Sequence, residues 1–319
     1  MKLFEHPEFP EAIKAVRSYF NHPGLTEQFI EKDYYITESL RIVASQWPDT
    51  VIFKGGTSLS KGWKLIERFS EDIDLFLNKN AFTPPAGENK ITNELKAIRD
   101  AVQKHPGLTL LSNGTNTKGV SRTSYYDYRQ YFSGLGSVKS RILLEMGTRS
   151  GSYPITSVRL SSYISDFLTE TKNSLEAEDE LPFSMNLLHF KRTFVEKLFA
   201  IHSKVMRFKD TGKSIGTYAR HYYDLFQLAK EPDVREMIED ESYQKIKEDC
   251  ASISRTHFPH QSDPPIDLMF SSSPALFPTQ DIRNNIAKEY QQQCQTLCYG
   301  SFPSWEEVEA CFEEIREKL

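Results

Sequence analysis

Residues 53–77 read FKGGTSLSKGWKLIERFSEDIDLFL, and this stretch decides the fold. A short apolar strand breaks at Gly55-Gly56, and the spacing of apolar residues predicts a following helix with a stripe from Leu59 to Ile66. The segment from Asp72 to Leu77 then alternates with period 2, which predicts a second strand. A strand, a turn, a helix and a strand in this order indicate an α/β sheet domain.

The second strand carries two acidic residues, Asp72 and Asp74, which share a face because strand residues i and i+2 point the same way. Aspartate is disfavoured in strands, and two carboxylates about 6 Å apart repel by roughly 3 kcal/mol at an effective dielectric constant near 20. A divalent cation between them removes this repulsion, and oxygen ligands of this kind suit Mg²⁺ or Mn²⁺ bound together with substrate phosphates. Asp72 and Asp74 are therefore predicted to be metal ligands and catalytic residues. The alternative is a solvated strand face.

The glycine turn is the predicted nucleotide-binding site. Gly55 and Gly56 let a ligand approach the backbone closely, and the helix that begins at Thr57 points its free N–H groups toward that ligand. The hydroxyls of Thr57 and Ser58 and the ammonium of Lys61 are further predicted phosphate donors. With Mg²⁺ bridging the triphosphate to the aspartates, in-line attack by an acceptor hydroxyl on the α-phosphate of an NTP would release pyrophosphate.

Neither of two glycine- and lysine-containing segments is a phosphate-binding P-loop. Ser60 stands five residues after Gly55, where the motif requires glycine. At Gly212-Lys213-Ser214, Arg207 stands where the first glycine should be.

A third carboxylate is expected from a neighbouring strand. The predicted strand 138–146 is apolar around Glu145, so this acid needs a partner. Glu145 is predicted to be catalytic, as a metal ligand or in support of the general base. A salt bridge to Arg141 or Lys139 is the alternative.

The remaining patterns predict an α/β domain over 1–150, a connecting segment over 151–185 that ends near Pro182, and a mainly helical domain over 186–319. In the first domain, helices are predicted at 10–20, 25–46 and 92–104, and strands at 51–53, near 108–112, at 123–132 and at 138–146. In the last, helices are predicted at 187–207, 216–230, 233–250, 280–298 and 304–318, with a loop from Pro259 to Pro278.

Composition limits the function classes. The length of 319 residues suits two domains, and 39% hydrophobic with 26% charged residues is typical of a globular protein. A net charge of -5 predicts no general nucleic-acid coat, so any polyanion needs a local basic cleft. The sequence shows no signal peptide and no apolar run of about 18 residues, so a cytoplasmic protein is expected. The four cysteines are expected to be reduced thiols.

Residues 53–75 resemble the first motif of the AbiEii/AbiGii nucleotidyltransferases, the toxins of type IV toxin–antitoxin systems within the polymerase-β-like superfamily. The signature of that superfamily is a Gly-Gly or Gly-Ser turn, a spacer and Asp-x-Asp, and the spacer here is longer than usual. Glu31–Tyr35 resembles the lead-in helix of the family, and Glu196–Leu198 and Arg220–Leu225 resemble its later motifs.

The resemblance implies a nucleotidyltransferase-fold mixed sheet with flanking helices, Mg²⁺ as cofactor, and an NTP bound in a cleft between the two domains. It also implies that Lys197 and Asp224 complete the active site, with Arg220 near the nucleotide. The residues alone leave other interpretations open. Lys197 could belong to a solvated basic helix face, and Arg220 and Asp224, at i and i+4, could simply pair.

The family also implies a cognate antitoxin, a role in phage defence, and an RNA acceptor, in particular the 3′ end of tRNA. A basic cluster near the proposed site is consistent with RNA: Lys191, Arg192, Lys204, Arg207, Lys209 and Lys213. The alternatives are a nucleotidyltransferase that modifies a protein or a small molecule, and a degenerate nucleotide-binding module.

Overall fold

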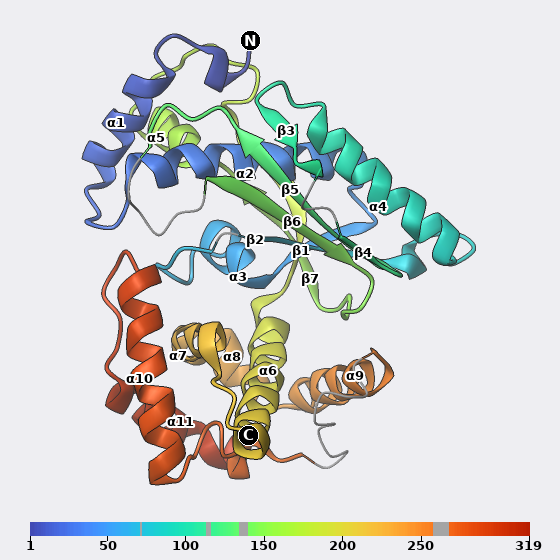
Figure 1. Ribbon diagram of the computed structural model, residues 1–319, viewed down its shortest axis with the longest axis vertical. Coiled ribbons are helices and arrows are strands. Elements are labelled where there is room, and N and C mark those ends of the chain that lie inside the picture. Colours follow the sequence, from blue (N-terminus) through green and yellow to red (C-terminus); the bar gives the residue numbers. More distant parts are fainter. Residues whose placement is uncertain (71, 113–115, 134–139, 258–267) are drawn as a thin grey trace. The chain divides into compact units, whose positions relative to one another are not determined.

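The computed structural model describes residues 1–70, 72–112, 116–133, 140–257 and 268–319 (Figure 1). The chain divides into two compact units. The first contains Met1–Lys64 and Phe69–Leu188, and the second contains Leu65–Arg68 and His189–Leu319. The four residues Leu65–Arg68, between the glycine turn and the Asp-x-Asp strand, thus belong to the second unit.

The described residues of the first unit form an eight-stranded mixed sheet in the order β3-β5-β6-β2-β1-β8-β7, with β4 paired to β5. The pairs β2–β6 and β1–β8 are parallel, and the other pairs are antiparallel. The strands are β1 (Val51–Lys54), β2 (Asp72–Leu77), β3 (Leu108–Leu110), β4 (Asn116–Lys118), β5 (Ser121–Tyr128), β6 (Arg141–Gly147), β7 (Ile155–Leu160) and β8 (Phe183–Leu188). The predicted α/β class with a mixed sheet is confirmed.

Helices cover one face of this sheet (Figure 1). They are α1 (Phe9–Phe20), α2 (Glu27–Gln46), α4 (Glu88–Gln103) and α5 (Tyr163–Glu170). Thr26 caps α2 by accepting a hydrogen bond from the backbone N–H of Phe29, which fixes where this long helix begins. Ile73 and Leu75 of β2 are buried in one core with apolar residues of these helices. Because side chains alternate along a strand, Asp72 and Asp74 lie on the opposite face.

The helix after the glycine turn is shorter than predicted. It consists of α3 (Gly55–Thr57) and a π-helical turn, η2 (Ser58–Gly62), and Lys64 then adopts a left-handed φ of 54°. The expected extension of the apolar stripe to Ile66 is therefore wrong. Ile66 is buried instead as part of the second unit.

The segment predicted as a connection, 151–185, contributes β7, α5 and the first half of β8 to the first unit, which extends to Leu188. The helix predicted from 187 begins only at Phe190. The apolar pair Leu187-Leu188 fits a strand as well as a helix. Both residues are buried, and Leu187 pairs with Phe53 of β1, so the pair belongs to a strand.

The second unit is helical as predicted. Its helices are α6 (Phe190–Thr211), η5 (Gly216–Ala219), α7 (Arg220–Lys230), α8 (Pro232–Met237), α9 (Glu241–His257), α10 (Gln280–Leu297) and α11 (Trp305–Ile315). The helix predicted over 233–250 is split between α8 and α9, and 258–267 of the predicted loop lie outside the described residues. All four cysteines are free thiols, as expected. Among the described helices, none is long and apolar enough to cross a membrane.

Candidate active site

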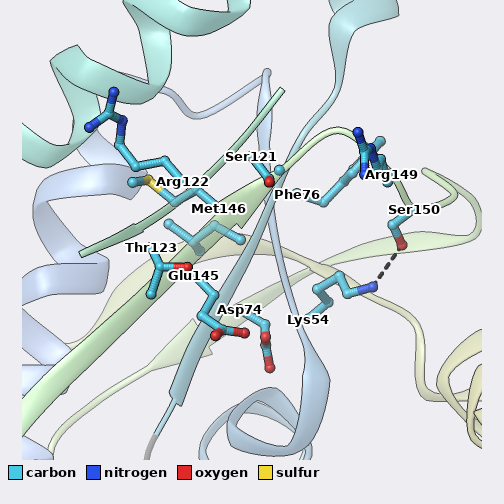
Figure 2. Close-up of a pocket in the computed structure, with 12 residues that line it drawn as sticks. Lys54, Asp74, Phe76, Ser121, Arg122, Thr123, Glu145, Met146, Arg149 and Ser150 are labelled. Carbon is cyan, nitrogen blue, oxygen red and sulfur yellow. Dashed lines mark hydrogen bonds between the residues drawn. The ribbon is translucent and has the colours of Figure 1, made fainter. Parts of the chain in front are cut away.

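The structure brings Glu145 beside Asp74. The two residues are register partners on the parallel strands β2 and β6, so their side chains point to the same face of the sheet, with the strands about 4.8 Å apart. Figure 2 shows their carboxylates next to each other. Arg141, one alternative partner of Glu145, lies over the ring of Tyr125 at 4.5 Å, and the other, Lys139, lies outside the described residues.

The turn requires glycine at position 55 for two reasons, its backbone conformation and its close approach to Asp74. The φ of Gly55 is 80°, in the left-handed region, and a Cβ built there would lie 2.1 Å from Asp74 Oδ2. Asp74 therefore packs directly against the glycine backbone. Asp72, Asp74 and Glu145 together offer only oxygen donors, which fit a hard divalent cation such as Mg²⁺.

The hydroxyls of Thr57 and Ser58 face inward. Thr57 Oγ1 donates a hydrogen bond of 2.5 Å to the carbonyl oxygen of Asp72, and Ser58 Oγ donates one of 2.8 Å to that of Gly55. Ser58 has no solvent-exposed surface. The Thr57 bond joins the turn to the start of β2, and the Ser58 bond closes the turn on itself, so both hydroxyls stabilise the turn. The predicted contacts of both hydroxyls with phosphate remain predictions.

Lys61 lies in a buried ion pair. Its Nζ is 2.6 Å from Asp33 Oδ1 on α2 and donates a 2.8 Å hydrogen bond to the carbonyl oxygen of Ser161. Only 6% of the Lys61 side chain is exposed. The structure thus gives this ammonium protein partners on α2 and at Ser161 in place of a nucleotide phosphate.

Lys197 and Asp224 meet in the second unit, together with an arginine that sequence reasoning missed. Arg68 donates two hydrogen bonds to Asp224, from Nε to Oδ1 at 2.6 Å and from a terminal nitrogen to Oδ2 at 2.7 Å. Lys197 Nζ lies 2.7 Å from Asp224 Oδ2 and 3.1 Å from His221 Nδ1. The side chains of Arg68 and Asp224 are 2% and 0% exposed.

This network determines the charge of its members. Burial alone would raise the pKa of Asp224, but Arg68 and Lys197 hold the pKa well below its usual value. Burial lowers the pKa of Lys197 and lowers that of His221 to about 3. The Arg220–Asp224 pair that the spacing suggested gives way to the pairs with Arg68 and Lys197. The Nε of Arg220 is buried and has no hydrogen-bond partner among the described residues.

Arg68 gave no signal in the sequence. It lies within the spacer, where a single arginine is typical of a solvated surface, and its partner is 156 residues away. The backbone of Glu67 makes further hydrogen bonds within the second unit. Glu67 N donates to Tyr223 Oη at 3.0 Å, and Tyr299 N donates to the carbonyl oxygen of Glu67 at 3.0 Å.

The basic cluster expected to bind RNA is partly neutralised within the second unit. Arg192 is buried and pairs with Glu196 and Asp249, at 3.2 and 2.5 Å. Lys204 lies over the ring of Tyr218 at 4.2 Å from its centroid. These contacts reduce the positive charge that this cluster could offer to an RNA backbone.

A different acidic group, Glu38, His105 and Asp179, has potential ligand atoms within 4.8 Å of one another, the only group of this kind in the described part of the chain. The Nζ of Lys2 lies 3.3 Å from Glu38 and 3.8 Å from Asp179, so an ammonium balances this charge. The carboxylates on the sheet face are more open, as expected for a cation that also binds substrate phosphates.

Comparisons with known proteins add independent findings. A family model described as nucleotidyl transferase AbiEii toxin of the type IV toxin–antitoxin system matches residues 39–314. A comparison with curated proteins gives no match. Among solved structures, the chain is similar to MenT4, a nucleotidyltransferase toxin from Mycobacterium tuberculosis H37Rv, with 12% identity, 96% of each chain covered and a TM-score of 0.46.

Proposed function

Since the chain belongs to the AbiEii family of nucleotidyltransferase toxins of type IV toxin–antitoxin systems, we propose that it transfers a nucleoside monophosphate from an NTP to an acceptor hydroxyl and releases pyrophosphate. One observation carries the proposal. Asp72, Asp74 and Glu145 project from adjacent strands on the face of the sheet that the core helices leave open, and Asp74 packs against the glycine turn.

Asp72 and Asp74 are the proposed ligands of Mg²⁺ or Mn²⁺. When bound, the cation neutralises the phosphate charge and polarises the α-phosphate. The backbone N–H groups of Gly55 and Gly56 and of the helical turn after them orient the triphosphate, because helix N-termini favour anions. The absence of a Cβ at Gly55 keeps Asp74 in place against the turn.

Glu145 is the proposed general base. Its exposed carboxylate lies beside Asp74, where it can accept the proton of an incoming hydroxyl. The hydroxyl oxygen then bonds to the α-phosphorus while the bond from that phosphorus to the bridging oxygen breaks. Pyrophosphate leaves with the electron pair of that bond.

For Lys197 and Asp224 we propose a positioning role. Together they hold Arg68, and Arg68 lies four residues before Asp72 in the sequence. The buried network therefore fixes one end of the segment that leads into the metal-binding strand. Arg220, on the same helix as Asp224, is proposed to contact the nucleotide through its guanidinium.

The proposed acceptor is the 3′ end of an RNA, in particular tRNA, and the proposed protein partner is a cognate antitoxin. Membership of a type IV toxin family supports the antitoxin, and a role in phage defence is part of the proposal. A protein or small-molecule acceptor is the alternative, and the same experiment separates these acceptors.

The test is incubation of the protein with each α-³²P-labelled NTP, MgCl₂ and total cell extract, followed by separation of RNA, protein and small molecules. Label in RNA that disappears with EDTA or with Asp72→Asn supports the proposal. Label confined to protein or to a metabolite would show that the acceptor is not RNA, and the proposed nucleotidyl transfer would still stand. Failure of every NTP to label any fraction overturns the proposed function.

A further inference from the structure

A pocket of about 270 Å³ opens beside the candidate carboxylates, entirely within the first unit. It extends from Asp74 and Glu145 along β2 and β6 as far as Phe76 and Gly147. This volume lies just below the roughly 300–1,000 Å³ usual for small-molecule sites, so the pocket suits a ligand of about one nucleotide. Of its lining residues, Asp74 and Glu145 are the two that the sequence predicted as site residues.

The pocket is acidic at one end and basic along one side. Lys54, the neighbour of Asp74 on β1, and Arg149, which follows β6, both line it. Lys54 Nζ donates a 2.8 Å hydrogen bond to Ser150 Oγ, which holds the ammonium in place. Figure 2 shows Lys54, Arg149 and Ser150 together on one side of the pocket, and Thr123 beside Glu145 on the other.

The strand register separates this pocket from the glycine turn. Lys54 is opposite Asp74, and because β1 and β2 are antiparallel, Gly55 continues toward the Asp72 end of β2. The pocket continues the other way, from Asp74 toward Phe76. A triphosphate held at the turn and a ligand in the pocket would therefore lie on opposite sides of Asp74, which is the arrangement that two reacting substrates require.

The chemistry of the lining suits an anion with a nearby hydroxyl. An ammonium and a guanidinium bind phosphate through charge-assisted hydrogen bonds, and phosphate contacts position a nucleic-acid strand. Thr123 is the register partner of Glu145 on β5, so a hydroxyl lies beside the proposed general base. Such a hydroxyl suits the ribose 2′-OH, the group by which proteins distinguish RNA from DNA.

We propose that this pocket is the acceptor subsite, and that it takes the terminal nucleotide of a single-stranded RNA. Glu145 receives the 3′-hydroxyl. Lys54, held by Ser150, and Arg149 bind the phosphodiester that joins the terminal nucleotide to its neighbour. This assignment rests on the proposed function and adds to it the residues that recognise the acceptor.

The test compares Lys54→Gln and Arg149→Gln with Lys96→Gln, which removes the same charge from an exposed position on α4. Loss of one charge-assisted hydrogen bond should raise the KM for RNA by roughly 10- to 100-fold, whereas the KM for NTP should stay within about twofold. Each lost phosphate contact should also reduce the slope of log(kcat/KM) against log[salt] by about 0.7. Melting temperatures identify any variant that fails to fold, and Arg149, exposed in a loop, carries the test if Lys54→Gln unfolds.

The outcomes separate the two proposals. If the unmodified protein labels RNA but both pocket variants behave like Lys96→Gln, the subsite is wrong and the transferase chemistry stands. A rise in the KM for NTP with an unchanged KM for RNA also overturns the subsite, because the pocket then serves the nucleotide. If the unmodified protein labels no RNA, the proposed acceptor fails and the subsite with it.

Discussion

Asp74 is the residue on which the candidate site converges. It has Lys54 on one neighbouring strand, Glu145 on the other, and the backbone of Gly55 against its carboxylate. Two strand neighbours and the backbone of Gly55 thus surround this one side chain. A change at any of these neighbours is expected to act through the position of Asp74.

Gly55→Ala tests this directly. The new methyl group would lie 2.1 Å from Asp74 Oδ2, so we expect transfer to fall at least about 100-fold as Asp74 is displaced. The control is Gly212→Ala, which has a similar φ of 68° but no atom within 4 Å of its Cβ. Both variants carry the backbone strain of about 1–2 kcal/mol, so equal activities would show that the contact with Asp74 is unimportant.

Asp72→Asn and Asp74→Asn should each reduce transfer at least roughly 100-fold, since a neutral amide is a poor ligand for Mg²⁺. Melting temperatures should stay close to that of the parent, because relief of carboxylate repulsion offsets any lost contact. Asp49→Asn, the same change at an exposed position before β1, is the control. Full activity in either site variant places the metal elsewhere.

At this scale the sequence was informative where periodicity was strict. The alternation in β2 predicted that Asp72 and Asp74 share a face, and the resemblance of residues 53–75 to the AbiEii family is confirmed. The environment of Lys61 could not be predicted, because its partner Asp33 lies on a helix 28 residues earlier. Local spacing carries no information about which distant carboxylate will be buried beside a lysine.

At the scale of elements, the buried ion pairs around α7 are expected to be sensitive to substitution. Arg68→Met leaves Asp224 buried with only Lys197 to compensate it, and breaking a buried pair typically costs about 3–5 kcal/mol. We therefore expect a large loss of melting temperature. Lys245→Met, which breaks an exposed pair with Glu241, should cost at most about 1 kcal/mol. Similar denaturation curves for the two variants would contradict a structural role for the Arg68 network.

Helices and strands were predicted well where the apolar residues followed one clear period. They were predicted poorly where the apolar residues fitted both a helix and a strand. α1, α2, α10 and α11 begin and end near their predicted limits because each has a clear apolar stripe. The segment with β7 and β8 had no clear period in the sequence. Pairing with β1 supplied the missing information, and such pairing joins residues more than a hundred positions apart.

Acid should destabilise the whole molecule through its buried histidines. Burial lowers the pKa of His105 to about 4, so this side chain, 2% exposed beside Glu38, Asp179 and Lys2, is neutral in the folded state. Its folded pKa lies below the usual 6.5, so its stabilising contribution is complete above pH 6.5 and is lost as pH falls toward 4. At about 1.4 kcal/mol per pKa unit, the loss approaches 3 kcal/mol.

The measurement is urea unfolding between pH 7 and pH 4.5 for the parent and for His105→Gln. The difference in unfolding free energy between the two should shrink as pH falls, because only the parent must protonate a buried imidazole. Burial raises the pKa of Glu38, and its proton uptake affects both proteins alike. A difference that stays constant with pH would show that His105 does not titrate in this range.

At the scale of the molecule, composition and length predicted two parts and a helical second part. They could not predict that the second unit takes four residues, Leu65–Arg68, from within the first. Domain boundaries are predicted from changes in composition along the sequence. Four residues are too few to produce such a change. The structural role of Arg68 follows from its ion pair with Asp224, which the sequence does not predict.

The place of Leu65–Arg68 in the second unit sets an order of events during translation. Arg68 is synthesised 156 residues before Asp224, which at about 5–20 residues per second leaves it without its carboxylate for roughly 8–30 s. β1 likewise waits for β8 before it gains its parallel neighbour. A ribosome that stalls before residue 183 therefore holds a nascent toxin with an incomplete sheet and an uncompensated arginine four residues before its candidate metal-binding strand.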